Sequence, residues 1–202
     1  MLTERQYRWI PRLGAGRLLR SPTVFEDLIK MICTTNCNWA LTTRMTMNMV
    51  ALLGPTSPEN WKGFPDAPAI AGCTEHFVRT KIKAGYRSPY IIGLAEAVAS
   101  GRIDPERWRL PGKSTEDLRK ELLSIKGIGL YAAETMMRLL GHYQYTGLDT
   151  WVRGRYYELY HRGRRVTDRT ITRRYARFGR WAGLVFWLEM TKEWYQNGEG
   201  DV

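Results

Sequence analysis

Two glycines, Gly127 and Gly129, stand on either side of one apolar residue, and Asp149 follows them along the chain. Glycines at this spacing suit a turn that needs positive φ and that lets the backbone approach an outside group closely. In a basic protein that group is naturally a phosphate, because the N–H groups at the start of a helix bind anions. Asp149 stands where a further helix is expected to begin. Its carboxylate could cap that helix, or it could stabilise positive charge that develops in a reaction.

The glycines lie between two amphipathic segments that would hold them in place. Ser114 and Asp117 have the spacing of a capping box, and apolar residues follow at helical spacing as far as Ile125. The same period resumes after Gly129 and ends at a later glycine. The sequence therefore predicts two helices joined by a tight hairpin at about 114–140.

The net charge of the chain indicates an acidic partner. Its 202 residues contain 31 Lys and Arg against 20 Asp and Glu, which gives a net charge of +11 and a pI near 9.8. This charge is typical of nucleic-acid-binding proteins, although membrane surfaces and simple solubility are competing explanations. We expect nucleic acid to be the partner.

The distribution of apolar residues indicates neither a membrane span nor a secretory signal. No apolar run reaches the ~20 residues of a membrane span, and the basic N-terminal segment lacks the apolar core of a secretory signal. The three cysteines, Cys33, Cys37 and Cys73, show no disulfide pattern. We therefore expect a cytoplasmic protein without a membrane partner, associated with the nucleoid if the source is prokaryotic.

Helical periodicity recurs along the chain, without strand alternation or an internal repeat. The sequence predicts an all-α fold of two helical lobes with a cleft between them. We expect a basic N-terminal arm at 1–22 and one domain at 23–202. Its lobes would be formed by about 23–110 and by about 111–202 together with the arm.

The two ends of the chain each carry a specific expectation. The arm could be loosely ordered and contact DNA, or it could be packed through Tyr7, Trp9 and Ile10. The apolar period near the C-terminus predicts one long helix from about Thr170 to Tyr195.

The order of LLSIKGIG, a helix, a loop and LDTWVRGR resembles the helix-hairpin-helix DNA glycosylase superfamily. Asp149 lies 18 residues after Tyr131, an interval similar to the one between the hairpin helix and the catalytic aspartate of that superfamily. Weaker similarity extends over most of the chain from residue 21 onward. The chain is most similar to the alkylpurine (3-methyladenine) glycosylase II branch, which has no iron–sulfur cluster.

This resemblance implies a base-excision enzyme in which Asp149 is the catalytic residue. Relatives that also cut the DNA strand carry a lysine at the position of Tyr131, and that lysine forms a Schiff base with the sugar. A phenol cannot form one. The resemblance therefore implies a monofunctional glycosylase that flips a damaged base out of double-stranded DNA, hydrolyses its N-glycosidic bond and leaves an abasic site.

The resemblance also implies three groups of binding residues. Contacts to the DNA backbone and to the gap left by the flipped base fall on Lys126, Gly127, Gly129, Thr34, Thr35 and Asn36, although the last three could simply cap a helix end. At least one of Trp39, Trp181 and Trp187 is expected in the base pocket, the alternative for each being the core. The backbone carbonyls of Leu123, Ile125 and Ile128 could hold a structural Na⁺ or K⁺ ion.

Differences between this sequence and other branches of the superfamily exclude some cofactors and reactions. No cysteine follows Cys73, so we expect no iron–sulfur cluster and no other cofactor. Lys30 occupies the position of the catalytic glutamate of adenine-mismatch relatives, which argues against that chemistry. The target could still be mismatched uracil or thymine, or a hypermodified base such as those of some viral DNA. A non-catalytic DNA-binding module is the competing class, and a monomer is expected in either case.

Overall fold

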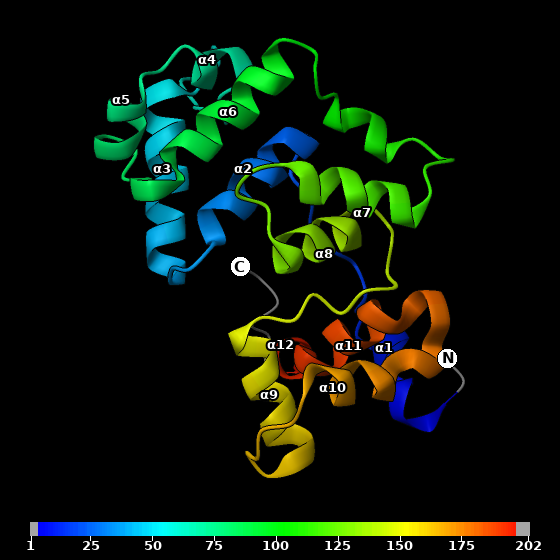
Figure 1. The fold of residues 1–202 in the computed structure, drawn as a ribbon. Coiled ribbons are helices and arrows are strands. Elements are labelled where there is room, and N and C mark those ends of the chain that lie inside the picture. The colour runs from blue at the N-terminus through cyan, green and yellow to red at the C-terminus, as the bar shows by residue number, and fades with distance from the viewer. Residues whose placement is uncertain (1–3, 197–202) are drawn as a thin grey trace. The chain divides into compact units, whose positions relative to one another are not determined.

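The computed structural model describes residues 4–196, and within this range the chain is helical without a β-strand (Figure 1). Thr56 and Lys62 form one isolated antiparallel bridge in a loop. The prediction of an all-α fold is confirmed. The α-helices are α1 (Trp9–Arg12), α2 (Val24–Thr34), α3 (Trp39–Leu53), α4 (Ala67–Ala71), α5 (Glu75–Thr80), α6 (Ser88–Ala99), α7 (Thr115–Ser124), α8 (Leu130–Leu139), α9 (Thr150–His161), α10 (Asp168–Tyr175), α11 (Ala182–Met190) and α12 (Lys192–Gln196). The 3₁₀ helices are η1 (Arg5–Tyr7), η2 (Gly85–Arg87), η3 (Pro105–Arg109) and η4 (Ala176–Trp181).

The chain divides into two compact units. The central unit is Arg20–Met136, and the terminal unit combines Met1–Leu19 with Met137–Val202. The boundary lies near residue 136, whereas the sequence placed it near residue 110. The hairpin belongs with the preceding helices because Trp108 Nε1 donates a hydrogen bond to Glu121 of α7 at 2.8 Å.

The central unit is built on the buried face of α2. Leu28, Ile29 and Ile32 are fully buried there, as the helical period predicts. The hydroxyl oxygen of Thr23 accepts a hydrogen bond from the Glu26 N–H at 3.1 Å, which caps the start of the helix. The helices α3 and α6 pack against α2.

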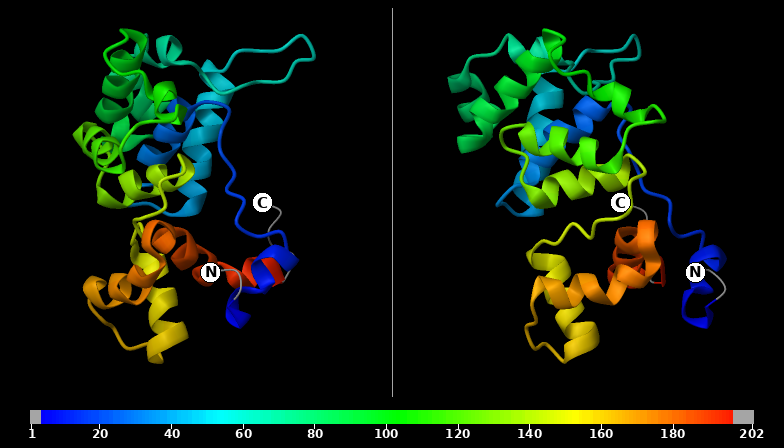
Figure 2. Two further views of the ribbon diagram at one scale, coloured as in Figure 1. Left: turned by 90° about the vertical axis from the view of Figure 1, so that its right-hand side faces the viewer. Right: turned by 45° about the vertical axis from the view of Figure 1, so that its right-hand side comes forward.

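The terminal unit contains an aromatic core that includes the N-terminal segment. Tyr7, Trp9 and Ile10 are buried in one hydrophobic cluster with α9, α10 and α11. Both views of Figure 2 show the N-terminal helix beside the C-terminal ones. Of the two alternatives for the N-terminal arm, the structure therefore shows the packed one.

The C-terminal segment is not the single helix that its period suggests. Gly179 adopts φ +52 inside η4, so α10 and α11 are separate helices. Positive φ is accessible to glycine at little cost, and a single such residue breaks the helical path. Apolar spacing continued across the break, which is why periodicity alone predicted one helix here.

One carboxylate connects the segments of the terminal unit. Glu189 of α11 accepts hydrogen bonds from Tyr7 at 2.6 Å, from Tyr160 of α9 at 2.5 Å and from Tyr175 of α10 at 2.6 Å. Burial, together with this carboxylate, raises the pKa of Tyr160 to about 12 and also raises the pKa values of Tyr7 and Tyr175. Within the described residues, no helix is long and apolar enough to cross a membrane.

These phenols predict a loss of stability at alkaline pH. Phenols of the unfolded chain ionise near pH ~10, whereas Tyr160 in the folded protein ionises near pH 12. Ionisation therefore favours the unfolded state between these values, so the contribution is complete below the unfolded pKa and is lost as the pH rises through the folded pKa. The melting temperature should fall over this range, and Tyr160→Phe should reduce the slope. A spectroscopic titration in which all 11 tyrosines of the folded protein ionise together at the unfolded value would contradict it.

Candidate functional site

The hairpin between α7 and α8 has the local structure that the sequence predicts. Ser114 accepts a hydrogen bond from the Asp117 N–H at 3.0 Å and donates one to the Asp117 carboxylate at 2.8 Å. Leu118 and Leu122 are fully buried on the inner face of α7. The capping box and the amphipathic face are both confirmed, and they place the glycine turn at the end of a fixed helix.

The two hairpin glycines differ in backbone conformation and in what surrounds them. Gly127 adopts φ +91, and a Cβ atom there would lie 2.8 Å from Cβ of Tyr90 in α6. Gly129 does not adopt positive φ, and a Cβ atom there would meet nothing within 4 Å. The expectation of positive φ is correct for Gly127 and wrong for Gly129. The close approach at Gly127 is to Tyr90 inside the protein, whereas Gly129 is exposed at the start of α8.

Other hairpin groups suit contact with a phosphate. Lys126 is exposed, and Leu130, the first residue of α8, is 53% exposed. The first N–H groups of a helix have no acceptor within the helix, so they can serve an anion. The carbonyl of Ile125 accepts the Ile128 N–H at 3.0 Å. An alkali ion on the carbonyls of Leu123, Ile125 and Ile128 would share that oxygen, and the ion stays a prediction.

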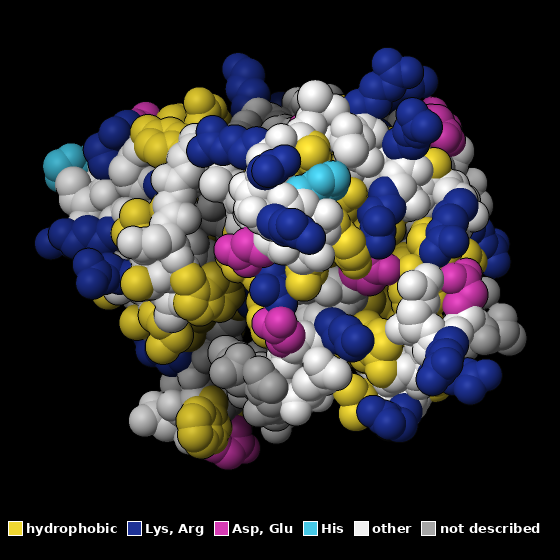
Figure 3. All heavy atoms as spheres, turned by 90° about the horizontal axis from the view of Figure 1, so that it is seen from below, with side chains coloured by type: hydrophobic (Ala, Val, Ile, Leu, Met, Phe, Trp, Pro, Cys, Tyr) yellow, Lys and Arg dark blue, Asp and Glu magenta, His cyan; other side chains and the backbone are white. Residues whose placement is uncertain are grey.

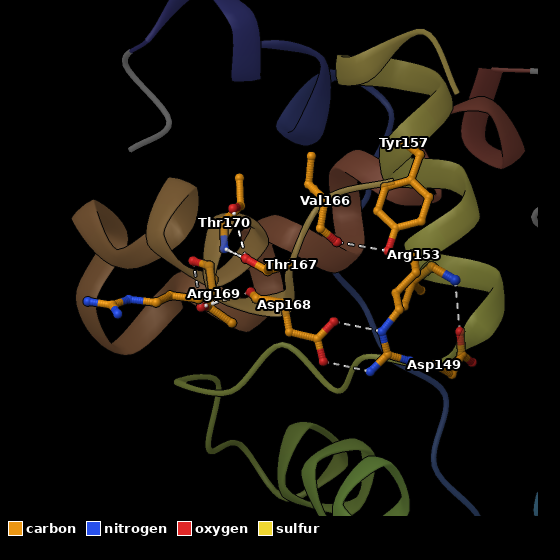
Figure 4. A network of polar contacts seen from close by, with 10 residues as sticks. Asp149, Arg153, Tyr157, Val166, Thr167, Asp168, Arg169 and Thr170 are labelled. Carbon is orange, nitrogen blue, oxygen red and sulfur yellow. Dashed lines mark hydrogen bonds and ion pairs between the residues drawn. The ribbon is translucent and has the colours of Figure 1, made fainter. Parts of the chain in front are cut away.

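Asp149 is the N-cap of α9. Its Oδ1 accepts the Val152 N–H at 2.7 Å, and its carbonyl accepts the Arg153 N–H at 3.2 Å. Arg153 in turn forms two hydrogen bonds of 2.8 Å to the carboxylate of Asp168 (Figure 4). This guanidinium lowers the pKa of Asp168. The capping role that the sequence allows is therefore present, with a half-buried carboxylate at the positive end of a helix.

The loop before Asp149 is fixed from both sides, by Arg138 before it in the chain and by Gly183 well after it. The Gly183 N–H of α11 donates to the Tyr143 carbonyl at 2.7 Å, and a Cβ atom on Gly183 would lie only 1.8 Å from the Tyr145 carbonyl oxygen. Arg138, which is 4% exposed, donates to the Thr146 carbonyl at 3.0 Å. The path of residues 141–148, and with it the position of the carboxylate, thus depends on a glycine and an arginine.

The polar residues after α2 cap the end of that helix, which is the alternative to a role at the DNA gap. The hydroxyl groups of Thr34 and Thr35 donate to carbonyls in the last turn of α2 at 2.7 and 2.8 Å. Asn36 is exposed, adopts φ +47 and donates to the Tyr86 hydroxyl at 3.4 Å. Arg87, which is 4% exposed, donates from Nε to the Thr35 carbonyl at 3.1 Å. Tyr86 and Arg87 thus support this tip, whose role at the DNA gap stays a prediction.

The three tryptophans considered for a base pocket have different surroundings. Trp39 is 72% exposed at the start of α3, which excludes the core alternative for this residue. Trp181 stacks on Tyr143 with ring centroids 5.3 Å apart. Trp187 is half-buried in α11, with the Arg138 guanidinium 4.9 Å from its ring centroid. A pocket of ≈ 220 Å³ in the terminal unit is lined instead by Tyr7, Arg174, Tyr175, Arg177, Phe178 and Glu189.

The candidate residues come from both units. The hairpin, Tyr131, the Thr34–Asn36 tip and Trp39 lie in the central unit, whereas Asp149, Trp181 and Trp187 lie in the terminal unit. Tyr131 is half-buried in the first turn of α8. In the described part of the chain, no group of three or more His, Cys, Asp or Glu side chains could hold a metal ion. Burial raises the pKa of the Cys33 thiol to about 12.

Sequence reasoning missed Arg138, Gly183, Tyr86 and Arg87. A lone glycine inside an apolar helical segment is a signal for close backbone packing, and Gly183 has that pattern. Arg138 had no such signal, because an arginine late in a helix is usually solvated. Tyr86 and Arg87 lie in a turn that the sequence marks only by its glycine and proline.

Known proteins share this architecture. The chain is 30% identical over 128 residues to the DNA-3-methyladenine glycosylase of Bacillus subtilis, over 61% of this chain and 42% of that protein. The solved 3-methyladenine DNA glycosylase from Archaeoglobus fulgidus covers 95% of this chain with a TM-score of 0.73 and 23% identity. The solved Clostridium acetobutylicum 8-oxoguanine glycosylase/lyase, bound to double-stranded DNA, covers 93% with a TM-score of 0.73 and 20% identity.

These similarities define the fold of the chain. At 20–23% identity, the solved proteins show that this chain has the fold that the resemblance implied, and the fold is the property shown to be shared. No protein-family model matches the chain. The chain spans less than half of the Bacillus subtilis protein and about two thirds of the two solved proteins, 67% and 69%.

The hairpin glycines give a matched pair of variants. Gly127→Ala should lower the free energy of unfolding by about 2–4 kcal/mol, because positive φ and the contact with Tyr90 both oppose a Cβ atom. Gly129→Ala should leave it unchanged or raise it by up to about 1 kcal/mol, while weakening DNA binding through the exposed amides. Denaturant unfolding and binding titrations measure the two effects. Equal stability losses in both variants would contradict the assignment.

The loop before Asp149 gives a second prediction. Gly183→Ala should displace the Tyr145 carbonyl, lower stability by about 2–3 kcal/mol and move Asp149 out of position. Gly93→Ala in α6 is the control, because Gly93 is a helical glycine whose Cβ position is open. That control should be neutral or slightly stabilising. Unfolding curves check both variants, and a Gly183→Ala protein as stable as wild type would show that the loop is not held there.

Proposed function

We propose that this chain is a monofunctional DNA glycosylase, which flips a modified base out of the duplex and hydrolyses its N-glycosidic bond. The observation that supports this most directly is the carboxylate of Asp149, held at the start of α9 after a loop fixed by Gly183 and Arg138. The fold is one whose solved examples include DNA glycosylases. The net charge of +11 suits a DNA partner.

Asp149 would act on the charge that develops at the sugar. As the bond from C1′ to the base nitrogen breaks, the base leaves with the electron pair and C1′ becomes positive. A fixed anion stabilises this transition state. A water molecule then forms the new bond to C1′, its proton is accepted by Asp149 or by the leaving base, and an abasic site remains. The capping bond to Val152 uses Oδ1 and fixes the carboxylate for this task.

Tyr131 makes us favour hydrolysis without strand cleavage. A β-elimination through a Schiff base needs an amine, and the residue at this position in α8 is a phenol. Lys126 lies in the exposed turn before α8, where a phosphate contact is the expected role. The glycosylase/lyase from Clostridium acetobutylicum shares the fold, so the fold alone does not distinguish the two reactions.

An alkylated purine is the target base that we favour. The support is the similarity to the Bacillus subtilis DNA-3-methyladenine glycosylase in sequence and to the Archaeoglobus fulgidus 3-methyladenine DNA glycosylase in fold. Mismatched uracil or thymine and a hypermodified base are the other targets that the sequence allows. A panel of duplexes that carry each of these bases distinguishes them.

Asp149→Asn is the test of the proposed chemistry. Asparagine caps helices as well as aspartate does, so the fold should be retained while the negative charge is lost. Excision, measured as strand cleavage after alkali, should fall on the order of 10²–10³-fold. If wild type and Asp149→Asn are equally inert on the whole panel, the non-catalytic DNA-binding module is correct. Nicking without alkali, or a complex trapped with borohydride, would overturn the monofunctional assignment.

A further inference from the structure

The end of α9 and the helix that follows form the most basic part of the chain. Between Arg162 and Arg180 the sequence contains eight arginines, no lysine and one acidic residue, Asp168. All eight arginine side chains are exposed. They are Arg162, Arg164, Arg165, Arg169, Arg173, Arg174, Arg177 and Arg180, and we refer to them as the arginine surface.

Most of these arginines have no acidic partner. The structure gives no ion pair within the described residues to five of them, Arg162, Arg164, Arg165, Arg169 and Arg173. Asp168 is occupied by both hydrogen bonds from Arg153. Figure 4 shows the side chain of Arg169 extending away from that pair. The positive charge of this segment is therefore not neutralised locally.

The other three arginines lie over aromatic rings. The guanidinium carbon of Arg174 is 3.7 Å from the Tyr160 ring centroid, that of Arg177 is 4.6 Å from Phe178, and that of Arg180 is 5.0 Å from Trp181. Stacking of this kind orders a long side chain and leaves the N–H groups at the rim available. Arg177 also pairs with Glu4 at 3.4 Å.

The turn that carries the first arginines is fixed by backbone hydrogen bonds. Arg162 and Gly163 adopt φ +52 and +79, and the Gly163 N–H donates to the Tyr157 carbonyl at 2.9 Å. The Tyr157 hydroxyl donates to the Val166 carbonyl at 3.1 Å. A charged but purely solvating segment does not need such a fixed path, whereas a binding surface gains affinity when it is ordered in advance.

We propose that the arginine surface binds the backbone phosphates of duplex DNA at a distance from the excised base. Arginine suits this partner because its planar group contacts phosphate oxygens in pairs, which a lysine cannot do. Figure 3 shows a face of the molecule on which Lys and Arg side chains greatly outnumber acidic ones. The site assigned here is separate from the hairpin, and its placement relative to a target base rests on the proposed function.

The length of α9 limits how far from the target base Arg162 can reach the duplex. Asp149 caps one end of this 12-residue helix and Arg162 ends the other, a separation of about 18 Å. That length corresponds to roughly five base pairs of B-DNA. Measured along the duplex, a contact made by Arg162 would therefore fall at most about half a helical turn from the base that Asp149 acts on.

Charge-neutralising variants test this surface against a matched control. The test variant is Arg164→Gln/Arg165→Gln/Arg169→Gln. The control, Arg79→Gln/Arg102→Gln/Arg107→Gln, removes the same charge from exposed arginines of the central unit. Affinity for an undamaged duplex is measured over a salt series, together with thermal unfolding. The test variant should bind on the order of tenfold more weakly at physiological salt, with a salt slope smaller by about 2–3, because each phosphate contact contributes about 0.9. The control should bind as wild type does.

Two further measurements separate this proposal from the proposed activity. Wild type should gain affinity when the flanks of the duplex are extended from roughly 3 to 10 base pairs, and the test variant should not. In an Asp149→Asn background the loss of affinity should persist, so failure of the excision chemistry leaves this result readable. Equal affinities and slopes for the test and control variants would overturn the proposal. So would tight binding of anionic lipid vesicles, lost only in the test variant, with unchanged DNA binding.

Discussion

The terminal unit depends on one carboxylate that three phenols satisfy. A partly buried glutamate is costly unless hydrogen bonds replace its water shell, and Glu189 receives them from Tyr7, Tyr160 and Tyr175. These donors come from η1, α9 and α10, while the acceptor belongs to α11. Loss of the carboxylate would leave three partly buried hydroxyl groups without this acceptor, which costs more than the bonds contribute. The segments of the unit are therefore mutually dependent.

Both ends of α9 are held by α11. Near its C-terminal end, α9 is tied to Glu189 through Tyr160. At its start, the loop that leads to Asp149 runs across Gly183, with the Tyr143 carbonyl accepting the Gly183 N–H. One helix thus sets the path of the loop and the direction of α9. The position of the Asp149 carboxylate follows from these two constraints, since the cap bond alone fixes it only relative to its own helix.

The sequence predicted those parts of the structure whose causes are local. Ser114 with Asp117, and Thr23 with Glu26, are three residues apart, so their caps could be predicted from spacing alone. Asp149 as an N-cap was predictable for the same reason. The fold class followed from periodicity, because every long apolar segment in the chain has a helical repeat.

The remaining features depend on partners that are distant in the sequence. Gly183 meets a loop about 40 residues away, and Tyr7 meets Glu189 across 182 residues. The lone glycine signals close packing at position 183, but local sequence identifies the partner in neither case. Gly179 broke an apolar period that continued on both sides. The expectation of positive φ was wrong for Gly129. Two glycines that look alike in the sequence have different surroundings, Tyr90 in one case and open space in the other.

Two kinds of phosphate contact would divide the work of binding under the proposed function. The amides at the start of α8 carry no net charge, so they can fix one phosphate in place without releasing many counterions. The arginine surface carries full charges, and counterion release makes its contribution large and dependent on salt. Register would then come from the hairpin and most of the affinity from α9, α10 and η4. This division explains how a chain can combine a small hairpin turn, with Lys126 as its charged residue, and a net charge of +11, because positioning and attraction are tasks for different parts of the molecule.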